Sequence, residues 1–546
     1  MSRRASRALP LPSPPPPLAS HPPRPRPRPA AALPSSRRHN SSAVPRPLSH
    51  PPPTHFQAPP TTKSYGQPLP STHPHLLAPG ELTLGISARE YADRRARLME
   101  GLEDGAVVVI TGGKTLYMTQ NIFYRFRQRS NFWYLTGFEE PDSALVLQKD
   151  SSAKGYRMTL FVRQKDAYDE LWNGARTGIE GACEVFGADD AVDSSYFTHR
   201  LRSLLSSSRG PVYIDLPDIS PSRSRPSRSS RSFIDYLSGS TPKKSETDEM
   251  LDVLGKRELR SGAKAVERLR LIKSEAEVKV MRKAAEISCA AHSKMNSPII
   301  IQVMRLAKPG ISENALVSHF EHHTSLAGSP RPAYVPVCAS GTQALTIHYI
   351  ENNRRCKEGE MVLLDAGCEY GGYCSDITRT FPVSSTFSTA QKHLYEAVLR
   401  VLKHTTTYCT ASANLSLEEL HRISVDATRT ELRDLGFQLR GGDLERVLYP
   451  HFVSHPLGVD LHDTMSFTRD EKLKAGMVIT VEPGLYVPPL PHFPKGFHNQ
   501  VVRLEDEVLV RDDDYVVLSV DAPKEVADVE ARCLGLLDGV GVNKEE

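Results

Sequence analysis

Acidic residues interrupt or end four apolar, β-rich segments in the second half of this 546-residue chain. The four acids are Asp365, Asp376, Glu482 and Glu505. Asp and Glu are almost never fully buried in proteins unless a partner neutralises or hydrogen-bonds them. Burying an unpaired carboxylate costs so much free energy that the group would give up its charge instead. A fold that buries these strands must therefore neutralise or hydrogen-bond the acids.

Two of the segments read as a hairpin, because Gly371-Gly372 separates the β-rich runs Met361–Tyr370 and Tyr373–Val383. Asp365 and Asp376 are equally distant from a centre between Tyr370 and Gly371, so we expect them opposite one another on neighbouring strands. Cross-strand partners have Cβ atoms about 4.5 to 5.5 Å apart. Two carboxylates that close repel unless a cation lies between them. The alternative is that one or both Asp residues bond turn amides.

Three histidines, His451, His455 and His462, fall within twelve residues. One histidine alone is more often a satisfied core or loop residue than a ligand, and the cluster does not identify a metal by itself. For either glutamate the alternative is an edge residue in a salt linkage, for example with Arg503. The joint interpretation is a ligand set of four carboxylates and one imidazole from one domain: Asp365, Asp376, His455, Glu482 and Glu505. Such a set balances two divalent cations and suits manganese, cobalt or zinc.

The first 80 residues contain nine Arg, one Lys and no Asp or Glu, with long Pro-rich runs. This composition cannot assemble a core, so we expect disorder. A basic, acid-free N-terminus is typical of a mitochondrial transit segment; the alternative is a Pro-rich tail in a cytoplasmic protein. The rest of the chain is acidic on balance, which argues against nucleic-acid binding. No apolar run approaches the roughly 18 residues of a membrane span, and the eight Cys form no C-x-x-C pair.

The domain organisation that we predict has three parts. Residues 1–76 are a presequence, 77–260 an α/β domain, and 261–540 the catalytic domain. The first domain opens with a helix from a Ser87 capping box and continues through β-rich segments. These segments are Ala106–Thr111, Phe132–Leu135, Ser143–Gln148, Met158–Phe161 and Val212–Ile214. The Ser- and Arg-rich residues 218–248 are expected to be an insertion, and a helical region from about 258 to 291 leads into the second domain.

At the acids and histidines the sequence resembles the pita-bread metallopeptidases, the family of aminopeptidase P, prolidase and methionine aminopeptidase. Asp365 and Asp376 match the family's two metal aspartates, and His455 in Ser-His-Pro-Leu-Gly matches the metal histidine. Glu482 in Val-Glu-Pro-Gly and Glu505 in Arg-Leu-Glu-Asp match the metal glutamates. The resemblance implies that His348, His451 and His462 contact substrate, and that these histidines, Glu482 and Arg503 form the catalytic set. It also implies two metal ions, most consistently manganese.

Residues outside the ligand set narrow the resemblance to one branch of the family. The run from Gln128 to Ser143 looks like the N-terminal domain of aminopeptidase P, and Pro74–Thr83 and Asp521–Val526 resemble its mitochondrial, intermediate-cleaving branch. The implied fold is an α/β N-terminal domain followed by a C-terminal α+β pita-bread domain. The implied function is removal of the N-terminal residue from peptides or imported mitochondrial proteins by a metal-bridging hydroxide, in the matrix or at the matrix-facing inner membrane. Relatives suggest a homodimer.

Alternatives within and outside the enzyme class stay open. The chain resembles Xaa-Pro aminopeptidases, enzymes that remove one bulky residue, and prolidase-type dipeptidases, and sequence does not rank these specificities. A catalytically inactive pita-bread binding protein is the rival from another class, although such relatives typically lose the ligands that are present here. Two departures from the family pattern concern Val501, where Gly is usual, and the apparent insertion Asn296–Gln302. If position 501 requires a positive φ, a β-branched residue would be strained there.

Overall fold

The computed structural model describes residues 64–216, 246–255, 257–293 and 303–536. Its first half is built on a six-stranded mixed sheet of strand order β6-β5-β4-β3-β7-β8. The antiparallel pairs β3–β4 and β4–β5 form the middle, and β6, β7 and β8 add in parallel. The strands are β3 (Val107–Thr111), β4 (Ala144–Lys149), β5 (Tyr156–Val162), β6 (Asp190–Asp193), β7 (Val212–Asp215) and β8 (Leu259–Ser261).

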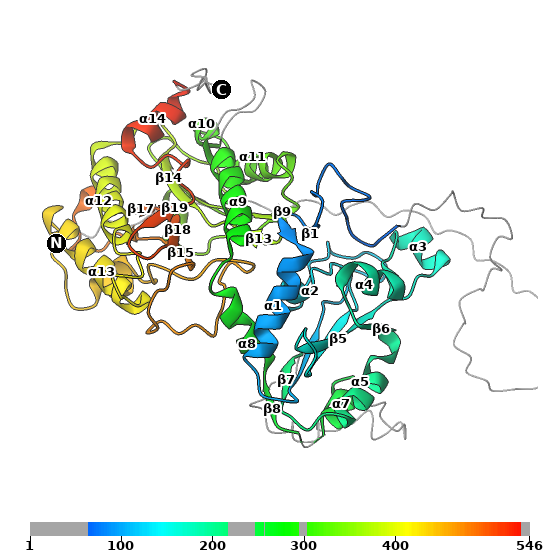
Figure 1. The fold of residues 1–546 in the computed structure, drawn as a ribbon. Helices are drawn as coiled ribbons and strands as arrows, with labels where there is room; N and C mark the ends of the chain where they lie inside the picture. The colour runs from blue at the N-terminus through cyan, green and yellow to red at the C-terminus, as the bar shows by residue number, and fades with distance from the viewer. Residues whose placement is uncertain (1–63, 217–245, 256, 294–302, 537–546) are drawn as a thin grey trace, which may run out of the picture. The chain divides into compact units, whose positions relative to one another are not determined.

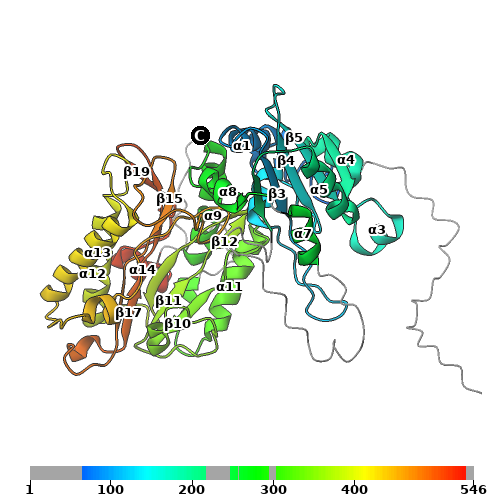
Figure 2. The same cartoon turned by 90° about the horizontal axis from the view of Figure 1, so that it is seen from below.

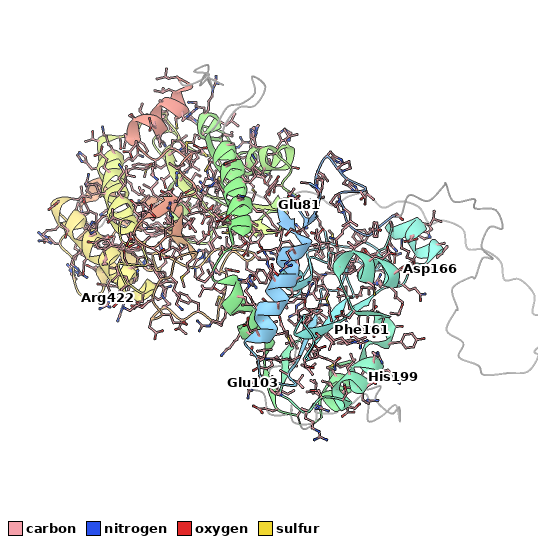
Figure 3. All side chains as sticks on the ribbon, viewed as in Figure 1. Glu81, Glu103, Phe161, Asp166, His199 and Arg422 are labelled. Carbon is pink, nitrogen blue, oxygen red and sulfur yellow. The ribbon has the colours of Figure 1, made fainter. Side chains whose placement is uncertain are left out.

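Helices cover both faces of this sheet. They are α1 (Ala88–Glu100), α2 (Ser130–Thr136), α3 (Ala167–Asn173), α4 (Gly178–Phe186), α5 (Phe197–Ser206) and α7 (Glu246–Leu254), with a small sheet of β1 (Glu81–Thr83) and β2 (Ile86–Ser87) before α1. One apolar cluster joins α5 and α7 to the sheet, where the Phe161 ring of β5 packs edge-on against Phe197. Figure 3 shows Phe161 and His199 of α5 in this region. The sheet therefore has apolar residues on both faces.

Our prediction that the segment Phe132–Leu135 is β-rich is wrong. These residues lie in the helix α2, which ends at Gly137 in the left-handed conformation (φ 65°), and the Gly137 N–H bonds to Trp133 O. All four side chains are buried. A short, continuous apolar run is compatible with both a buried strand and a buried helix. Here Gly137, directly after the run, is the local signal that favours a helix, because glycine is common at helix C-termini.

Part of the segment that we predicted to be presequence belongs to the folded body. Residues from Ser64 onward pack against the first domain, although the Pro-rich composition had placed them in the presequence. The Gln67 side-chain amide donates to Gly137 O (2.9 Å) and its oxygen accepts from Glu139 N, and Leu69 and Leu77 are buried. These few apolar anchors and one buried amide order the segment in spite of its prolines.

The second half starts with the helices α8 (Gly262–Arg270) and α9 (Glu275–Ser293) and contains four small antiparallel sheets. The sheets are β10-β11-β14, β13-β12-β9, β15-β18-β19 and β16-β17. The strands are β9 (Arg331–Pro332), β10 (Val337–Ser340), β11 (Met361–Asp365), β12 (Cys368–Tyr370), β13 (Tyr373–Cys374), β14 (Thr378–Pro382), β15 (Val478–Val481), β16 (Gly484–Val487), β17 (Gln500–Arg503), β18 (Asp506–Val510) and β19 (Tyr515–Val517).

The remaining helices surround these sheets. They are α10 (Val303–Leu306), α11 (Glu313–Leu326), α12 (Thr389–Thr406), α13 (Leu417–Asp434) and α14 (Val526–Leu534). Helices α12 and α13 lie side by side, and α12 contacts β15, β16 and β17 (Figure 1). Helix α11 lies beside β10, as Figure 2 shows. One large core cluster links these helices to the sheets β10-β11-β14, β15-β18-β19 and β16-β17.

The two halves share a core. One apolar cluster contains α1 and α2 residues together with Tyr373 and Cys374 of β13, and the Trp133 and Tyr373 rings are 5.8 Å apart. The fully buried Arg94 of α1 donates to Tyr373 Oη (3.1 Å) and lies 3.5 Å from Glu277. Strand β13 is only two residues from Asp376, so the first domain supports the strand that leads into the candidate site. Among the described residues, no helix is both long enough and apolar enough to cross a membrane.

Candidate functional site

Four of the five candidate metal ligands lie at or near the ends of strands in the second half of the chain, and the fifth, His455, lies in a loop. Asp365 ends β11, Asp376 lies between β13 and β14, and Glu482 lies between β15 and β16. Glu505 lies in the two-residue connection between β17 and β18. His455 lies in a loop, and the residue after it, Pro456, forms a β-bridge to Ile479 of β15. Four different sheets therefore each deliver at least one ligand.

These strand ends converge on one point. His455 Nε2 lies 3.4 Å from Asp376 Oδ2 and 3.7 Å from Glu482 Oε1. Ligand atoms of Asp376, His455 and Glu505 all lie within 4.8 Å of one another. Asp365 joins the group through Tyr334, whose hydroxyl contacts both Asp365 and Asp376. The structure thus brings all five side chains together, although more than 100 residues of chain separate the first from the last.

The register of the hairpin differs from our expectation. Asp365 pairs with Thr378, not with Asp376, because the turn is centred on Gly371-Gly372 and pairs Tyr370 with Tyr373. A two-residue turn places its neighbours opposite each other, so our assumed centre was one residue too early. Asp376 lies two residues before the true partner of Asp365, in the break between β13 and β14.

The electrostatics of this group call for cations. Burial raises the pKa of Asp365, and it raises the pKa of Glu505 well above its ordinary value, with Asp376 repelling both. Burial, together with the neighbouring carboxylates, also raises the pKa of Glu482 to about 7. Carboxylates that repel one another in a buried site are the environment that divalent ions neutralise. The oxygen-rich donor set with one imidazole therefore fits two hard or borderline divalent ions.

In the described structure, Arg503 is the one buried guanidinium that bonds to a carboxylate oxygen of these acids. Its Nη2 donates to Asp365 Oδ2 (2.6 Å) and its Nη1 to Tyr486 Oη (2.6 Å), and only 2% of the residue is exposed. It fixes one oxygen of Asp365 and leaves the other toward Tyr334 and the centre of the group. Its catalytic role stays a prediction, and its contacts are those of a residue that orients a ligand.

Tyr334 is a site residue that our sequence reasoning missed. Its hydroxyl lies 2.7 Å from Asp376 Oδ1 and also bonds to Asp365. It precedes β10 in an irregular segment, and a lone tyrosine there carries no recognisable spacing to the acids. Burial and the two aspartates raise its pKa well above the ordinary value, so its hydroxyl keeps its proton and donates.

The three outer histidines line a cavity of about 720 Å³ next to the acids. Burial, with Arg503 nearby, lowers the pKa of His451 to about 3, so the ring is neutral; its buried Nε2 has no protein partner. The His462 ring is exposed and lies 4.4 Å from the His455 ring, while His348 is exposed on the opposite segment before β11. The structure therefore places all three around the ligands, and their contacts with substrate stay a prediction.

The rest of the cavity wall is mainly apolar. Val335, Ile350, Phe452 and Met465 line it with exposed side chains, and between 49% and 79% of each residue is accessible. Exposed apolar side chains around polar groups are typical of a binding site for an organic ligand. The cavity can therefore hold an apolar side chain beside the acids.

The structure describes one of the two departures from the family pattern, Val501. Val501 does not have a positive φ, and it is buried in β17, where it pairs with Tyr486. Its side chain packs with Val337 and Leu363. The expected strain at Val501 is therefore absent. The apparent insertion Asn296–Gln302 lies outside the described residues.

Comparisons with known proteins agree with this geometry. Residues 279–512 match metallopeptidase family M24, and residues 91–213 match the aminopeptidase P N-terminal domain. Over 483 residues the chain is 39% identical to Xaa-Pro aminopeptidase 3 of Mus musculus, spanning 86% of this chain and 90% of that protein. The chain belongs to metallopeptidase family M24. The prediction of the aminopeptidase P family and its metallopeptidase class is confirmed.

Two further M24 relatives come from yeast and a plant. The chain is 37% identical to intermediate cleaving peptidase 55 of Saccharomyces cerevisiae, covering 85% of this chain and 88% of that protein. A crystal structure of the yeast protein superposes with a TM-score of 0.71 at 34% identity, covering 83% of this chain and 98% of that one. The mitochondrial intermediate cleaving peptidase 55 of Arabidopsis thaliana is 33% identical, with 86% and 88% covered. The predicted fold, an α/β N-terminal domain followed by a pita-bread domain, is confirmed.

Proposed function

We propose that this M24 enzyme removes the N-terminal residue from peptides or imported proteins with the help of two divalent metal ions. The observation that carries the proposal is the convergence of four carboxylates and His455 beside a cavity of about 720 Å³. A chain of the same family that only bound ligands would have no need to keep so many repelling acids buried together. The metalloaminopeptidases among its relatives support the same reaction.

The five ligands divide between two ions in the proposal. Asp376 and Glu505 would contact both, Asp365 would complete one, and His455 with Glu482 would complete the other. Two divalent ions at such a site lower the pKa of a shared water and polarise the scissile carbonyl. Manganese is the ion that we propose, because oxygen donors dominate the set.

The protein's own groups would manage protons and position the peptide. The Glu482 carboxylate, which lies 3.8 Å from His451 Nδ1, is the group that would accept a proton released near the ligands. In the neutral His451 ring, Nδ1 donates to Phe452 O (2.9 Å), so Nε2, which has no partner among the described residues, is left to accept from a donor such as a substrate amine. His348 and His462 lie at the cavity wall, where they would contact the first peptide group.

The substrate class has two candidates. The name of the mouse relative points to peptides with Pro in second position, and the yeast name points to processing intermediates. The apolar cavity wall favours a bulky first residue such as Tyr, Phe or Leu. Comparing hydrolysis of an Arg-Pro-Pro peptide, a Gly-Pro dipeptide and a Tyr-Ser peptide tests this choice. A preference for the Gly-Pro dipeptide would instead assign a prolidase-type activity.

Compartment and assembly belong to the same proposal. The acid-free, arginine-rich N-terminus and the mitochondrial plant relative support action in mitochondria, where imported proteins expose trimmed N-termini. We also propose a homodimer, which light scattering of the purified protein would test. Imaging of the full chain with a C-terminal tag tests the compartment, and a purely cytosolic signal would contradict it.

Chelation tests the central claim. Removal of metal should abolish peptide hydrolysis, and manganese should restore it. A protein that hydrolyses peptides equally well after verified metal removal would refute the metal mechanism. A protein that shows no hydrolysis with any of the three peptides or metals would favour the inactive binding role.

A further inference from the structure

A buried group of ions holds the loop that carries His455 and His462. We call this group the Arg270 cluster; its members are Arg270, Lys273, Asp460 and Asp463. Arg270 is the last residue of α8, the helix that follows the first domain. Only 3% of Arg270, 7% of Lys273 and 2% of Asp463 are exposed, so most of the cluster is out of water. None of the proposed metal ligands belongs to it.

The geometry of the cluster fixes both ends of the loop's last turn. Arg270 Nη2 donates to Asp460 Oδ2 (2.5 Å) and also to Asp463 Oδ1, while Lys273 Nζ lies 3.2 Å from Asp463 Oδ2. Burial alone would raise the pKa of Asp463, but Arg270 and Lys273 outweigh it and hold the pKa below the ordinary value. The two cations thus balance two anions, and Asp463 stays ionised next to His462.

The first domain contributes directly to the same loop. Arg270 Nη1 donates to Asn131 Oδ1 (2.7 Å), and Ser130 Oγ donates to Asp460, so two residues of α2 reach the cluster. Arg127, just before α2, donates from Nη2 to Val459 O (2.7 Å). The loop is therefore held from outside the catalytic domain as well as from inside it.

Backbone contacts leave the loop little freedom of its own. Asp463 N donates to Pro456 O (3.0 Å), which closes the turn, and Cys374 N donates to Gly458 O (2.8 Å), which ties it to β13. A Cβ atom at Gly458 would lie 2.5 Å from Asp463 Oδ2, so the carboxylate packs where only glycine leaves room. The side chain of His462 extends from this fixed turn toward the ring of His455.

We propose that Arg270 is a positioning residue that acts through Asp463 to hold His462 at the metal site. Arg270 does not line the cavity, whereas Asp463 and His462 do. The proposal rests on the proposed function, because it needs His462 to contact the peptide. Catalysis is sensitive to small displacements of such groups. The first domain, through α2 and α8, then helps to set the geometry of a histidine in the second.

A double-mutant cycle separates positioning from general stability. The variants are Arg270→Met, His462→Ala and the pair, compared by kcat and KM on the peptide that the unchanged enzyme cleaves best. We expect Arg270→Met to lower kcat/KM about 10- to 100-fold, and to lower it less than about 2-fold further when His462 is already Ala. Manganese content, measured by atomic emission, should stay equal in all four proteins. A similar loss from Arg270→Met in both backgrounds would overturn the proposal.

Conservative and matched variants keep the test decisive. Arg400→Met removes a more exposed pair, between Arg400 of α12 and Glu431 of α13, and should leave kcat/KM unchanged. If Arg270→Met does not fold, Arg270→Lys and Asp463→Asn take its place, because Lys keeps the charge and Asn keeps the shape. Restoration of most activity by Arg270→Lys supports charge-based positioning, and loss that does not depend on His462 refutes it. Failure of the unchanged enzyme on every peptide would instead count against the proposed function.

Discussion

Replacing Arg379 by Met should destabilise the catalytic domain far more than an ordinary surface change. Arg379 of β14 is fully buried, and its Nη2 donates to Asp506 Oδ1 (2.7 Å) and to Ala522 O (2.9 Å). Its other nitrogens donate to three more backbone carbonyls, including Glu505 O (2.5 Å) and Thr378 O (2.9 Å). The substitution therefore removes one ion pair and four carbonyl contacts at once.

The expected loss of stability follows from the groups that Arg379→Met leaves buried without a partner. Breaking a buried pair by removing one partner costs about 3 to 5 kcal/mol, because the other charge stays desolvated. Lys524 and Ser519 still contact Asp506, which moderates the loss, whereas the orphaned carbonyls add to it. We expect a destabilisation of about 4 kcal/mol. In a folded body of this size the entropy of unfolding is on the order of 1 kcal/mol per kelvin, so the Tm should fall by about 4 °C.

Calorimetry of the manganese-loaded protein measures this change. Arg400→Met is the control, because its exposed pair with Glu431 is worth about 0 to 1 kcal/mol. The Tm of Arg379→Lys should lie between those of Arg379→Met and the control, because lysine keeps the positive charge but has fewer hydrogen-bond donors than arginine. A Tm of Arg379→Met within 1 °C of the control would refute the reasoning that this buried network stabilises the domain.

Three other predictions concern the site itself. After metal is stripped, manganese added to about 1,000 times its Kd should raise the free energy of unfolding by about 4 kcal/mol per ion in the unchanged protein and by less in Asp376→Asn. Equal gains in the two proteins, measured by calorimetry, would contradict the ligand assignment. Tyr334→Phe removes the hydroxyl shared by two aspartates. It should weaken manganese affinity about 10- to 100-fold in titration calorimetry, and unchanged affinity would exclude this role. Because the folded pKa of Asp463 is lowered, its stabilisation is present above about pH 4 and is lost as the pH falls through that lower pKa. The loss of Tm on acidification should therefore be smaller in Asp463→Asn, and a parallel loss would show that Asp463 does not contribute.

Four of the five candidate ligands could be singled out from sequence because they border short apolar strands, whereas His455, which lies in a loop, was selected by its clustering with His451 and His462. Asp365 and Glu482 each come at the end of such a strand, and acids in that place are rare enough to single out. The approximate boundaries of β3, β4, β5 and β7 were predictable for the same reason, since alternating or continuous apolar runs bounded by turns are strong signals. Local pattern and residue chemistry act together at these positions.

Other parts of the molecule carry no local signal. Tyr334 contacts two aspartates only because β10 pairs with β11, and nothing in its neighbouring residues encodes that pairing. Arg270 ends a surface-like helix with many charges, and its burial appears only when α2 and the loop near Asp463 pack against it. The helix α2 looked like a strand because burial on all sides removes the periodicity on which such predictions depend.

The hairpin shows why a prediction of proximity can survive an error of register. We placed Asp376 opposite Asp365, whereas Thr378 holds that position. Side chains alternate between the two faces of a strand, so a displacement of two residues keeps Asp376 on the same side, and a displacement of one would have turned it away. The two carboxylates then meet as diagonal neighbours, and the hydroxyl of Tyr334 reaches both. The eleven-residue spacing around a two-residue turn therefore constrains which face the acids share more strongly than it constrains which residues pair.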